Sequence, residues 1–378
     1  MYTWQHPRWP HFHYDKQSLT VAFTRYGEAM GNVTGSLSSI NPKDLCTIIA
    51  ETTVSNAVDS SAIEGEHLNL DCLKFNVMKN LSVPVGGRVM RRAKEEGVAS
   101  MAMTSRNTFN DPLSKIILDD LHKMALRHEI ENPPLLNTLR IGDYRQSDGM
   151  QIVSGRIDNP TVHYEAPPAA MVRQEMERFI DWFNKSRKDE SLTGVERAAI
   201  SHLWFETIHP YEDGNGRVGR AITDKALSQD IGYPTLACLS TAILEDHSTY
   251  YSELNKASTS LDITDWVKWF TRTTVRSYEI AMDKVDRVLD KARFWQAHSD
   301  KSFNERQEQT INTMFSMNPN NFGMTPKKYM GITRCSKATA TRDIAELRKR
   351  GCLTQEGKGR SVRYNLSIPC HPMKVWSI

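Results

Sequence analysis

The strongest constraint on this chain is the stretch 209–220, which reads HPYEDGNGRVGR. It combines an imidazole, two carboxylates, three glycines, an amide and two guanidinium groups, a mixture too polar and too permissive for a packed core. Helical patterns flank it on both sides, so we expect a loop that leads into a helix N-terminus. Unpaired backbone N–H groups and the positive end of the helix dipole lie at such a terminus, and both favour a bound anion.

The central residues of this stretch are suited to holding phosphate. Gly214 and Gly216 allow the backbone to approach a ligand closely. Asn215 has an amide that either fixes the loop or donates to the anion. Arg217 and Arg220 are three residues apart and share a helix face, where guanidinium groups bind phosphate oxygens bidentately. The spacing therefore predicts an anion site.

Two further side chains of the stretch add reactivity. Asp213 offers a hard oxygen ligand, which suits a Mg²⁺ ion that bridges phosphates. His209 is the side chain whose ordinary pKa suits a general base near neutral pH. A base, a metal carboxylate and an anion site together indicate phosphoryl or nucleotidyl transfer.

The stretch closely resembles the signature of the Fic family, His-Pro-aromatic-x-acidic-Gly-Asn-Gly-Arg-x-x-Arg, and every fixed position matches. The resemblance implies a protein adenylyltransferase, which moves AMP from ATP to a Ser, Thr or Tyr hydroxyl of a target protein or of itself. It implies that His209 deprotonates the hydroxyl and that Asp213 holds Mg²⁺ on the phosphates. The nucleotide contacts that it implies come from Asp213, Gly214, Asn215, Gly216, Arg217, Val218, Gly219 and Arg220.

Two other interpretations of the same letters are weaker. Gly214, Gly216 and Gly219 also fit the G-x-G-x-x-G fingerprint of dinucleotide-binding proteins. That fingerprint follows a buried strand, whereas a predicted helix precedes it here. The other alternative is a glycine-rich helix cap with solvated charges.

A second motif lies upstream, near the end of a helix predicted over about 42–64. Ser60 and Glu64 are four residues apart and therefore lie on one helix face, and Gly65 suits the position after the helix. These residues resemble the inhibitory motif of Fic proteins, Ser/Thr-x-x-x-Glu-Gly/Asn. The resemblance implies that Glu64 pairs with Arg220 and obstructs the γ-phosphate of the nucleotide. The physical reason is coherent, because a carboxylate in a phosphate site occupies the guanidinium and repels the anion.

Two β-prone runs around 151–155 and 161–164 flank a turn-rich segment and predict a hairpin. It resembles the flap of Fic proteins, on which a target protein docks through main-chain hydrogen bonds. The resemblance adds four nucleotide-lining positions, Ile152, Val153, Ser154 and Gly155. An ordinary surface hairpin is the alternative.

A pair of tyrosines, Tyr250 and Tyr251, follows the signature at the distance of the adenine-side wall of Fic proteins. Aromatic faces at that place stack on a base, and plain core packing is the alternative. Ser258 stands about where some members of the family have an asparagine. This departure leaves the choice of nucleotide base open.

The C-terminal part differs from the rest in charge. From 301 to 378 the chain has 14 Lys and Arg residues against 5 Asp and Glu, a net charge of +9, which leaves −6 for the first 300 residues. Three helical patterns and two β-prone runs with a basic tip between them resemble a winged helix-turn-helix. In that resemblance the recognition helix begins near Ser336. A DNA partner and a protein partner both remain open for this part.

Composition and length set the remaining limits. A chain of 378 residues suggests two or three domains, and the patterns place them at 1–110 (inhibitory helical region), 111–298 (Fic-type catalytic core) and 299–378 (winged helix). No apolar run has the 18 residues of a membrane span, and no signal peptide is visible. Six scattered cysteines favour reduced thiols, so we expect a cytoplasmic protein without a membrane partner.

The expected fold is mainly α: a Fic-type helical core with a small β-hairpin flap, followed by the winged helix-turn-helix domain. The expected function is Mg²⁺-dependent, autoinhibited protein adenylylation with ATP as co-substrate. Three alternatives stay open: removal of AMP, transfer of another phosphate-linked group on the same site, and a DNA-binding regulator whose core only senses nucleotide. Whether the protein forms a homodimer is also open.

Overall fold

Helices dominate the part of the chain that the structure, a computed structural model, describes. Those residues are 1–38, 40–83, 90–133, 139–156, 159–316 and 323–368, without the side chains of 153–156, 159–161, 163 and 360. The strands within these ranges form two separate two-stranded antiparallel sheets. The prediction of a mainly helical fold with a small hairpin is therefore confirmed.

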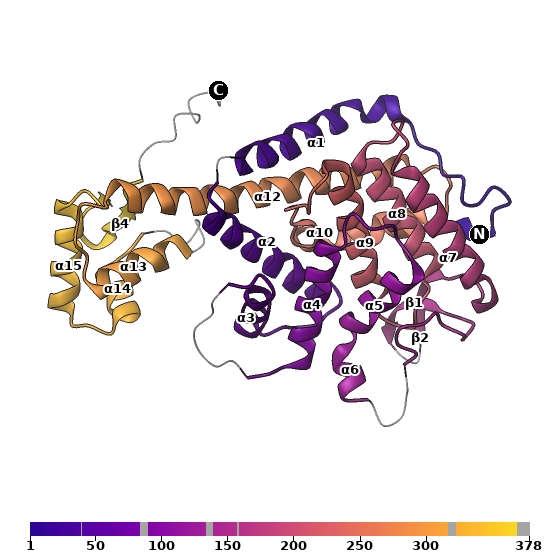
Figure 1. Cartoon of the computed structure of the whole chain (residues 1–378), viewed down its shortest axis with the longest axis horizontal. Coiled ribbons are helices and arrows are strands. Elements are labelled where there is room, and N and C mark those ends of the chain that lie inside the picture. The colour runs from indigo at the N-terminus through magenta and orange to yellow at the C-terminus, as the bar shows by residue number, and fades with distance from the viewer. Residues whose placement is uncertain (39, 84–89, 134–138, 157–158, 317–322, 369–378) are drawn as a thin grey trace. The chain divides into compact units, whose positions relative to one another are not determined.

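The chain divides into two compact units, 1–284 and 285–378. The limits expected from the sequence, after residues 110 and 298, stay predictions. The first unit contains most of the helices and one hairpin (Figure 1). Its elements are α1 Lys16–Leu37, α2 Pro42–Ile63, α3 Leu70–Asn80, α4 Ala93–Asn107, α5 Lys115–Ala125, α6 Arg127–Glu131, β1 Gln151–Arg156, β2 Asn159–Glu165, α7 Ala169–Ser186, α8 Gly194–Ile208, α9 Asn215–Ile231, α10 Leu239–Glu245, α11 His247–Ala257 and the larger part of α12 Thr264–Ala297.

Local sequence signals determine where the helices around the site begin. The side chain of Asn41 accepts a hydrogen bond from the Asp44 N–H at the start of α2, where a proline occupies the first turn. Thr193 and Glu196 form the capping box that opens α8. Both helices thus start at residues that their caps determine, and this sets the positions of their C-terminal ends, Ile63 and Ile208.

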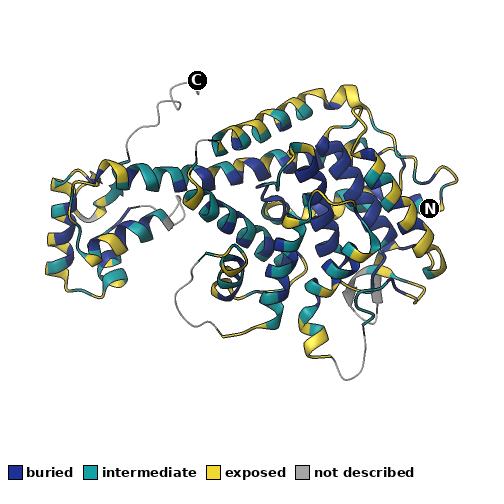
Figure 2. Cartoon of the chain, in the orientation of Figure 1, coloured by how far each residue is buried: buried dark blue, intermediate teal, exposed yellow. Residues whose placement is uncertain are grey.

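Helix α8 lies at the centre of the first unit. All of its residues are buried, and Figure 2 shows it in dark blue among its neighbours. Aromatic rings pack around it: Trp204 contacts Trp9 and Trp182, and Phe205 contacts Phe179. Helices α8 and α9 are packed against each other along their lengths, so the loop that joins them is held at both ends.

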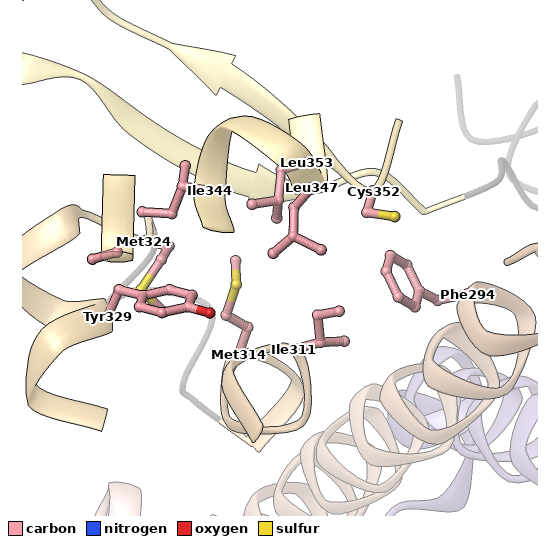
Figure 3. Packing of buried hydrophobic residues seen from close by; sticks show 10 residues of the cluster. Phe294, Ile311, Met314, Met324, Tyr329, Ile344, Leu347, Cys352 and Leu353 are labelled. Carbon is pink, nitrogen blue, oxygen red and sulfur yellow. The ribbon is translucent and has the colours of Figure 1, made fainter. Parts of the chain in front are cut away.

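The second unit has a core of its own. It contains the end of α12, then α13 Glu305–Ser316, α14 Pro326–Thr333, α15 Lys337–Lys349, β3 Leu353–Glu356 and β4 Arg363–Leu366. Figure 3 shows its buried side chains, among which Phe294, Ile311 and Leu347 are fully enclosed. The three helices and the hairpin form in the predicted order, while the assignment to the winged-helix class stays a prediction.

Within the described ranges, none of the helices combines the length and the apolar character that crossing a bilayer requires.

Candidate functional site

The predicted loop forms between α8 and α9. Helix α8 ends at Ile208, and His209 follows in the left-handed region (φ 49°, ψ 62°) with its N–H bonded to the Phe205 carbonyl at 3.0 Å. Gly214, also left-handed at φ 77°, precedes the first residue of α9, Asn215. Two left-handed residues thus reverse the chain within six positions and direct the N-terminus of α9 toward the loop.

Asn215 fixes the loop from inside. Its Oδ1 accepts the Tyr211 N–H at 2.9 Å, and its Nδ2 donates to the Tyr211 carbonyl at 2.8 Å. Both residues are buried. Of the two roles that the sequence left open for this amide, the structure therefore supports fixing the loop, since both of its polar atoms are engaged by the backbone.

His122 of α5 supports the same loop from outside, and sequence reasoning missed it. Its ring stacks on Tyr211 with centroids 3.9 Å apart. The Gly142 N–H donates to Nδ1 at 3.0 Å, so Nε2 carries the proton and donates to the Asp213 carbonyl at 2.9 Å. Burial lowers the pKa of His122 to about 4, which keeps this donor–acceptor arrangement at neutral pH.

Arg145 connects the loop to the segment before the hairpin. Its Nε donates to the His209 carbonyl at 2.9 Å, and its backbone N–H donates to the Pro210 carbonyl at 2.9 Å. Further side-chain N–H groups donate to the carbonyls of Ser147 and Pro167. One buried guanidinium therefore holds the backbone on which His209 is mounted.

The imidazole of His209 is largely buried but keeps some contact with solvent. Its side chain is 16% exposed, and its Nδ1 is buried without a hydrogen-bond partner in the described part of the chain. Burial, followed by the positive charge of Arg145, lowers the pKa of His209 to about 4. The ring is thus neutral at neutral pH, which is the form that accepts a proton.

Glu206 of α8, which sequence reasoning also missed, faces this ring. Its Oε2 lies 3.8 Å from His209 Nδ1, and its Oε1 is buried without a partner among the described residues. Burial first, and then the Glu64 carboxylate, raise the pKa of Glu206 to about 8. A glutamate one turn before a signature histidine gives no pattern signal of its own, since it reads as one more helix residue.

The packing of Glu206 explains a glycine of the signature. A Cβ atom on Gly219 would lie 2.4 Å from Glu206 Oε1, so glycine at this position leaves the carboxyl group where it is and a larger residue would displace it. Val218 beside it is fully buried. These two positions therefore pack within the helices, and their predicted nucleotide contacts stay predictions.

The start of α9 offers donors for an anion. Arg217 Nε and Arg220 Nη1 are both buried and have no hydrogen-bond partner in the described ranges. Two unused guanidinium N–H groups next to a helix N-terminus are costly unless a ligand completes them. The geometry thus agrees with the predicted anion site.

Asp213 is suited to a metal ion whose other coordinating atoms come mainly from a bound phosphate compound and water. Its side chain is 55% exposed, and Oδ1 accepts the Gly214 N–H at 2.6 Å, which leaves Oδ2 available. No group of three or more His, Cys, Asp or Glu side chains among the described residues is arranged to hold a metal. One carboxylate fits Mg²⁺, because this ion commonly takes one or two carboxylates and fills its shell with phosphate oxygens and water.

The end of α2 accepts hydrogen bonds from Arg220, the second arginine of the signature. Arg220 donates from Nε to Ser60 Oγ at 2.9 Å, and from Nη2 to the Ser60 carbonyl and to Glu64 Oε1, both at 2.8 Å. A Cβ atom on Gly216 would lie 2.2 Å from Glu64 Oε1. The predicted pairing of Glu64 with Arg220 is thus present in the structure, and the carboxylate sits against the backbone of the first turn of α9.

The first arginine is also paired with the segment after α2, which the sequence did not indicate. Arg217 Nη1 donates to Glu66 Oε2 at 3.1 Å and to the Ala125 carbonyl at 3.1 Å. Glu66 Oε1 lies 3.3 Å from Lys94 Nζ of α4. Gly65 between the two glutamates is left-handed at φ 76°, which turns the chain so that both carboxylates face α9.

The two tyrosines predicted near the base have different environments. Tyr250 is buried, and its hydroxyl contacts His202 Nε2 at 2.9 Å within the core. Tyr251 is 39% exposed, and its hydroxyl lies 3.5 Å from the Ile63 carbonyl at the end of α2. Of the pair, Tyr251 therefore has ring surface available for a ligand, whereas Tyr250 is packed in the core.

The predicted hairpin forms from β1 and β2, with a register shift between Ile152 and Val153. The Tyr164 hydroxyl donates to the Thr207 carbonyl at 2.5 Å, which attaches the hairpin to α8 two residues before His209. The side chains of Val153 and Ser154 lie outside the described part, as do those of 155–156, so the nucleotide-lining positions 152–155 stay a prediction.

Two family models match the chain. The model of the Fic/DOC family matches residues 112–227, and a model described as a domain of unknown function, DUF4172, matches residues 2–83. The first range contains α5, the hairpin, α8 and the signature loop. The second contains α2 and with it Ser60 and Glu64.

Curated relatives carry matching names. The "Protein adenylyltransferase Fic" of Nematostella vectensis is 27% identical over 61% of this chain and 49% of its own length. The "Protein adenylyltransferase fic-1" of Caenorhabditis elegans is 25% identical over 58% of this chain and 39% of its own length. The chain thus spans half or less of the length of these relatives.

Solved structures share the fold. A Fic family protein from Desulfovibrio desulfuricans G20 superposes with a TM-score of 0.54 at 19% identity, over 94% of this chain and 97% of that chain. Residues 134–508 of Fic-1 from C. elegans give a TM-score of 0.51 at 18% identity, over 72% of this chain and 74% of that chain. The signature loop, the family model and these neighbours agree, and residues 112–227 of the chain form a Fic/DOC family domain.

Proposed function

We propose that this protein is an adenylyltransferase that moves AMP from ATP to a Ser, Thr or Tyr hydroxyl of a target protein, and that Glu64 inhibits it by pairing with Arg220. One observation carries the proposal. A neutral imidazole stands beside a helix N-terminus where two buried guanidinium N–H groups have no partner in the described ranges. The names of the curated relatives support the same activity.

In the proposed reaction His209 accepts the proton of the target hydroxyl. The hydroxyl oxygen attacks the α-phosphorus of ATP, a new P–O bond forms, and the bond to the pyrophosphate leaving group breaks. Arg217 and Arg220 hold the phosphates against the charge that develops during transfer. The lowered pKa of His209 keeps it unprotonated before the reaction.

Asp213 would hold Mg²⁺, which would supply positive charge to neutralise the phosphates when bound. The chain's own contribution is the exposed Oδ2 of Asp213, held in place because Oδ1 accepts the Gly214 N–H. No group of three or more ligand side chains forms among the described residues, so we expect Mg²⁺ to arrive together with the nucleotide.

The target segment is proposed to dock on the hairpin. A two-stranded sheet leaves one edge of each strand without a partner strand in the described ranges, and such an edge accepts an extended peptide through main-chain bonds. Tyr164 and Arg145 tie this hairpin to the backbone around His209. A peptide bound to the hairpin would therefore be held at a fixed position relative to His209, the proposed general base.

Inhibition is proposed to arise from charge and space together. Glu64 uses an N–H of Arg220 that the γ-phosphate needs, and its negative charge repels the triphosphate. Glu66 does the same at Arg217, although the Ala125 carbonyl shares that guanidinium. A nucleotide that binds productively must displace at least the Glu64 contact.

The test uses ATP labelled at either the α- or the γ-phosphate. It compares label transfer to protein by the wild type and by His209→Ala. We expect transfer from α-labelled ATP to protein, no transfer from γ-labelled ATP, and a loss of at least a thousandfold in His209→Ala. His128→Ala, a change of an exposed histidine on α6, is the matched control and keeps the wild-type rate. Label transfer from the γ position, or undiminished transfer in His209→Ala, would reject the proposal. Release of AMP from a modified protein in place of its attachment would identify the reverse reaction.

A further inference from the structure

We propose a second function for this chain: the exposed face of α15 binds double-stranded DNA by entering its major groove. The first observation is the turn before it. Helix α14 ends at Thr333 and α15 begins at Lys337, so three residues join two helices that pack against each other. Arg334 in this turn is left-handed at φ 53°, which makes the chain change direction sharply. Two helices joined by a turn of three or four residues are the unit that places its second helix in a DNA groove.

The core of the second unit determines which face of α15 is outward. Ala340, Ile344 and Leu347 are buried in it, and Figure 3 shows Leu347 near Leu353 and Met314, with Ile344 beside Met324. These positions are separated by three or four residues and form one stripe of the helix. The opposite stripe is therefore presented to solvent by the packing of the unit itself.

Both acidic residues of α15 are turned away from that outward stripe and paired. Asp343 is buried, and its carboxylate accepts from the Tyr329 hydroxyl at 3.0 Å and from Arg306 Nε at 2.9 Å. Glu346 accepts from Gln307 Nε2 at 3.0 Å and also from Arg350. Both negative charges of the helix are thus paired with arginines and lie away from the outward stripe.

The outward stripe carries positive charge around a surface of small side chains. Lys337, Arg342 and Lys349 are exposed, and none of them has an acidic partner in the part of the chain that the structure describes. Between them the exposed positions are Ala338, Thr341 and Ala345. The Thr341 hydroxyl donates to the Lys337 carbonyl, so the threonine presents mainly its methyl group.

This arrangement fits a duplex better than an acidic protein. Small residues along the middle allow the helix backbone to approach the floor of a groove, where methyl groups contact thymine. Cations at the flanks meet the phosphates on either side, which supply most of the affinity. The net charge of +9 over residues 301–378 adds a long-range attraction to the same partner.

The experiment uses the full-length chain and a fluorescein-labelled 30-base-pair duplex of mixed sequence, followed by anisotropy across a salt series. We expect saturable binding. The logarithm of the binding constant should fall linearly with the logarithm of the salt concentration. Lys337→Ala/Arg342→Ala should weaken it at least tenfold at 100 mM salt and reduce the slope by about two, at roughly 0.9 per phosphate contact. Alanine suits an exposed helix position, so unchanged thermal unfolding verifies that the variant is folded.

The matched control is Lys268→Ala/Arg272→Ala, which removes the same charge from exposed positions of α12 in the first unit. It should retain the wild-type affinity. An RNA duplex of the same length should bind more weakly than DNA, because its deep, narrow major groove does not admit a helix. Three results would each overturn the proposal: no binding at 50 mM salt, equal losses in the two double variants, or equal affinity for the RNA duplex.

Discussion

The signature loop and the end of α2 meet at the same two arginines, yet they are held very differently. The loop is fixed by hydrogen bonds to its own backbone, from Asn215, His122 and Arg145, all of them buried. The end of α2 reaches the arginines through Ser60 and the carboxylates of Glu64 and Glu66, and the Glu64 side chain is 30% exposed.

This difference is what the proposed inhibition requires, because it sets a rigidly held loop against contacts that a ligand can replace. Breaking the loop bonds would leave buried backbone groups without partners, at about 1–3 kcal/mol each. Breaking the contacts of α2 leaves charged groups that phosphate or water can satisfy. A nucleotide can therefore compete with Glu64 without unfolding the site, and changes on the two sides should act in opposite directions on activity.

The largest effect is expected on the loop side. Asn215→Ala removes both hydrogen bonds to Tyr211, and the loop should lose the arrangement that positions His209 and Asp213. We expect the transfer rate to fall about a hundredfold, which corresponds to roughly 2.7 kcal/mol at 1.36 kcal/mol per factor of ten. Asn80→Ala, at an exposed asparagine of α3, is the control and should leave the rate unchanged. A wild-type rate in Asn215→Ala would show that this loop needs no internal support.

A smaller effect, on stability, concerns the carboxyl group behind His209. The pKa of Glu206 is raised in the folded state, to about 8, so the folded protein retains a proton that the unfolded chain loses above about 4.5. Its contribution to stability is therefore present below about pH 4.5 and is lost as the pH rises toward 8. Glu206→Gln cannot ionise and avoids that loss.

Thermal unfolding at several pH values measures this contribution. The melting temperature of Glu206→Gln minus that of the wild type should grow between pH 5 and pH 8 by about 6 °C or more, from roughly 3 kcal/mol at about 2–4 °C per kcal/mol. Because the amide disturbs packing equally at every pH, the change of this difference with pH is the informative quantity. A difference that is constant with pH would mean that Glu206 is already ionised in the folded protein.

Sequence patterns predicted the parts of the site whose signals are local. The loop between two helices and the shared face of Ser60 and Glu64 both follow from spacing within a few residues. The pairing of Glu64 with Arg220 spans 156 positions, and it came only from the resemblance to a family.

The residues that were missed act through partners far along the chain. His122 contacts a carbonyl 91 positions away. Its spacing from Leu118 and Ala125 places it on the buried face of α5, but no pattern indicates the carbonyl to which it donates. The packing of Gly219 against Glu206 of the neighbouring helix was missed in the same way, while its predicted nucleotide contact stays a prediction. Tyr250 is similar, since its hydroxyl bond to His202 exists only in the folded core.

The central claim is that the carboxylate of Glu64 inhibits a site that is otherwise ready, and the rate of Glu64→Gly tests it most directly. The measurement is the initial rate of AMP transfer from α-labelled ATP, with Glu66→Gln as a second variant that keeps the contacts of Arg220. We predict a rise of at least tenfold in Glu64→Gly, a smaller rise in Glu66→Gln, and no transfer when Glu64→Gly is combined with His209→Ala. A Glu64→Gly protein that binds ATP as the wild type does and transfers AMP no faster would contradict the account.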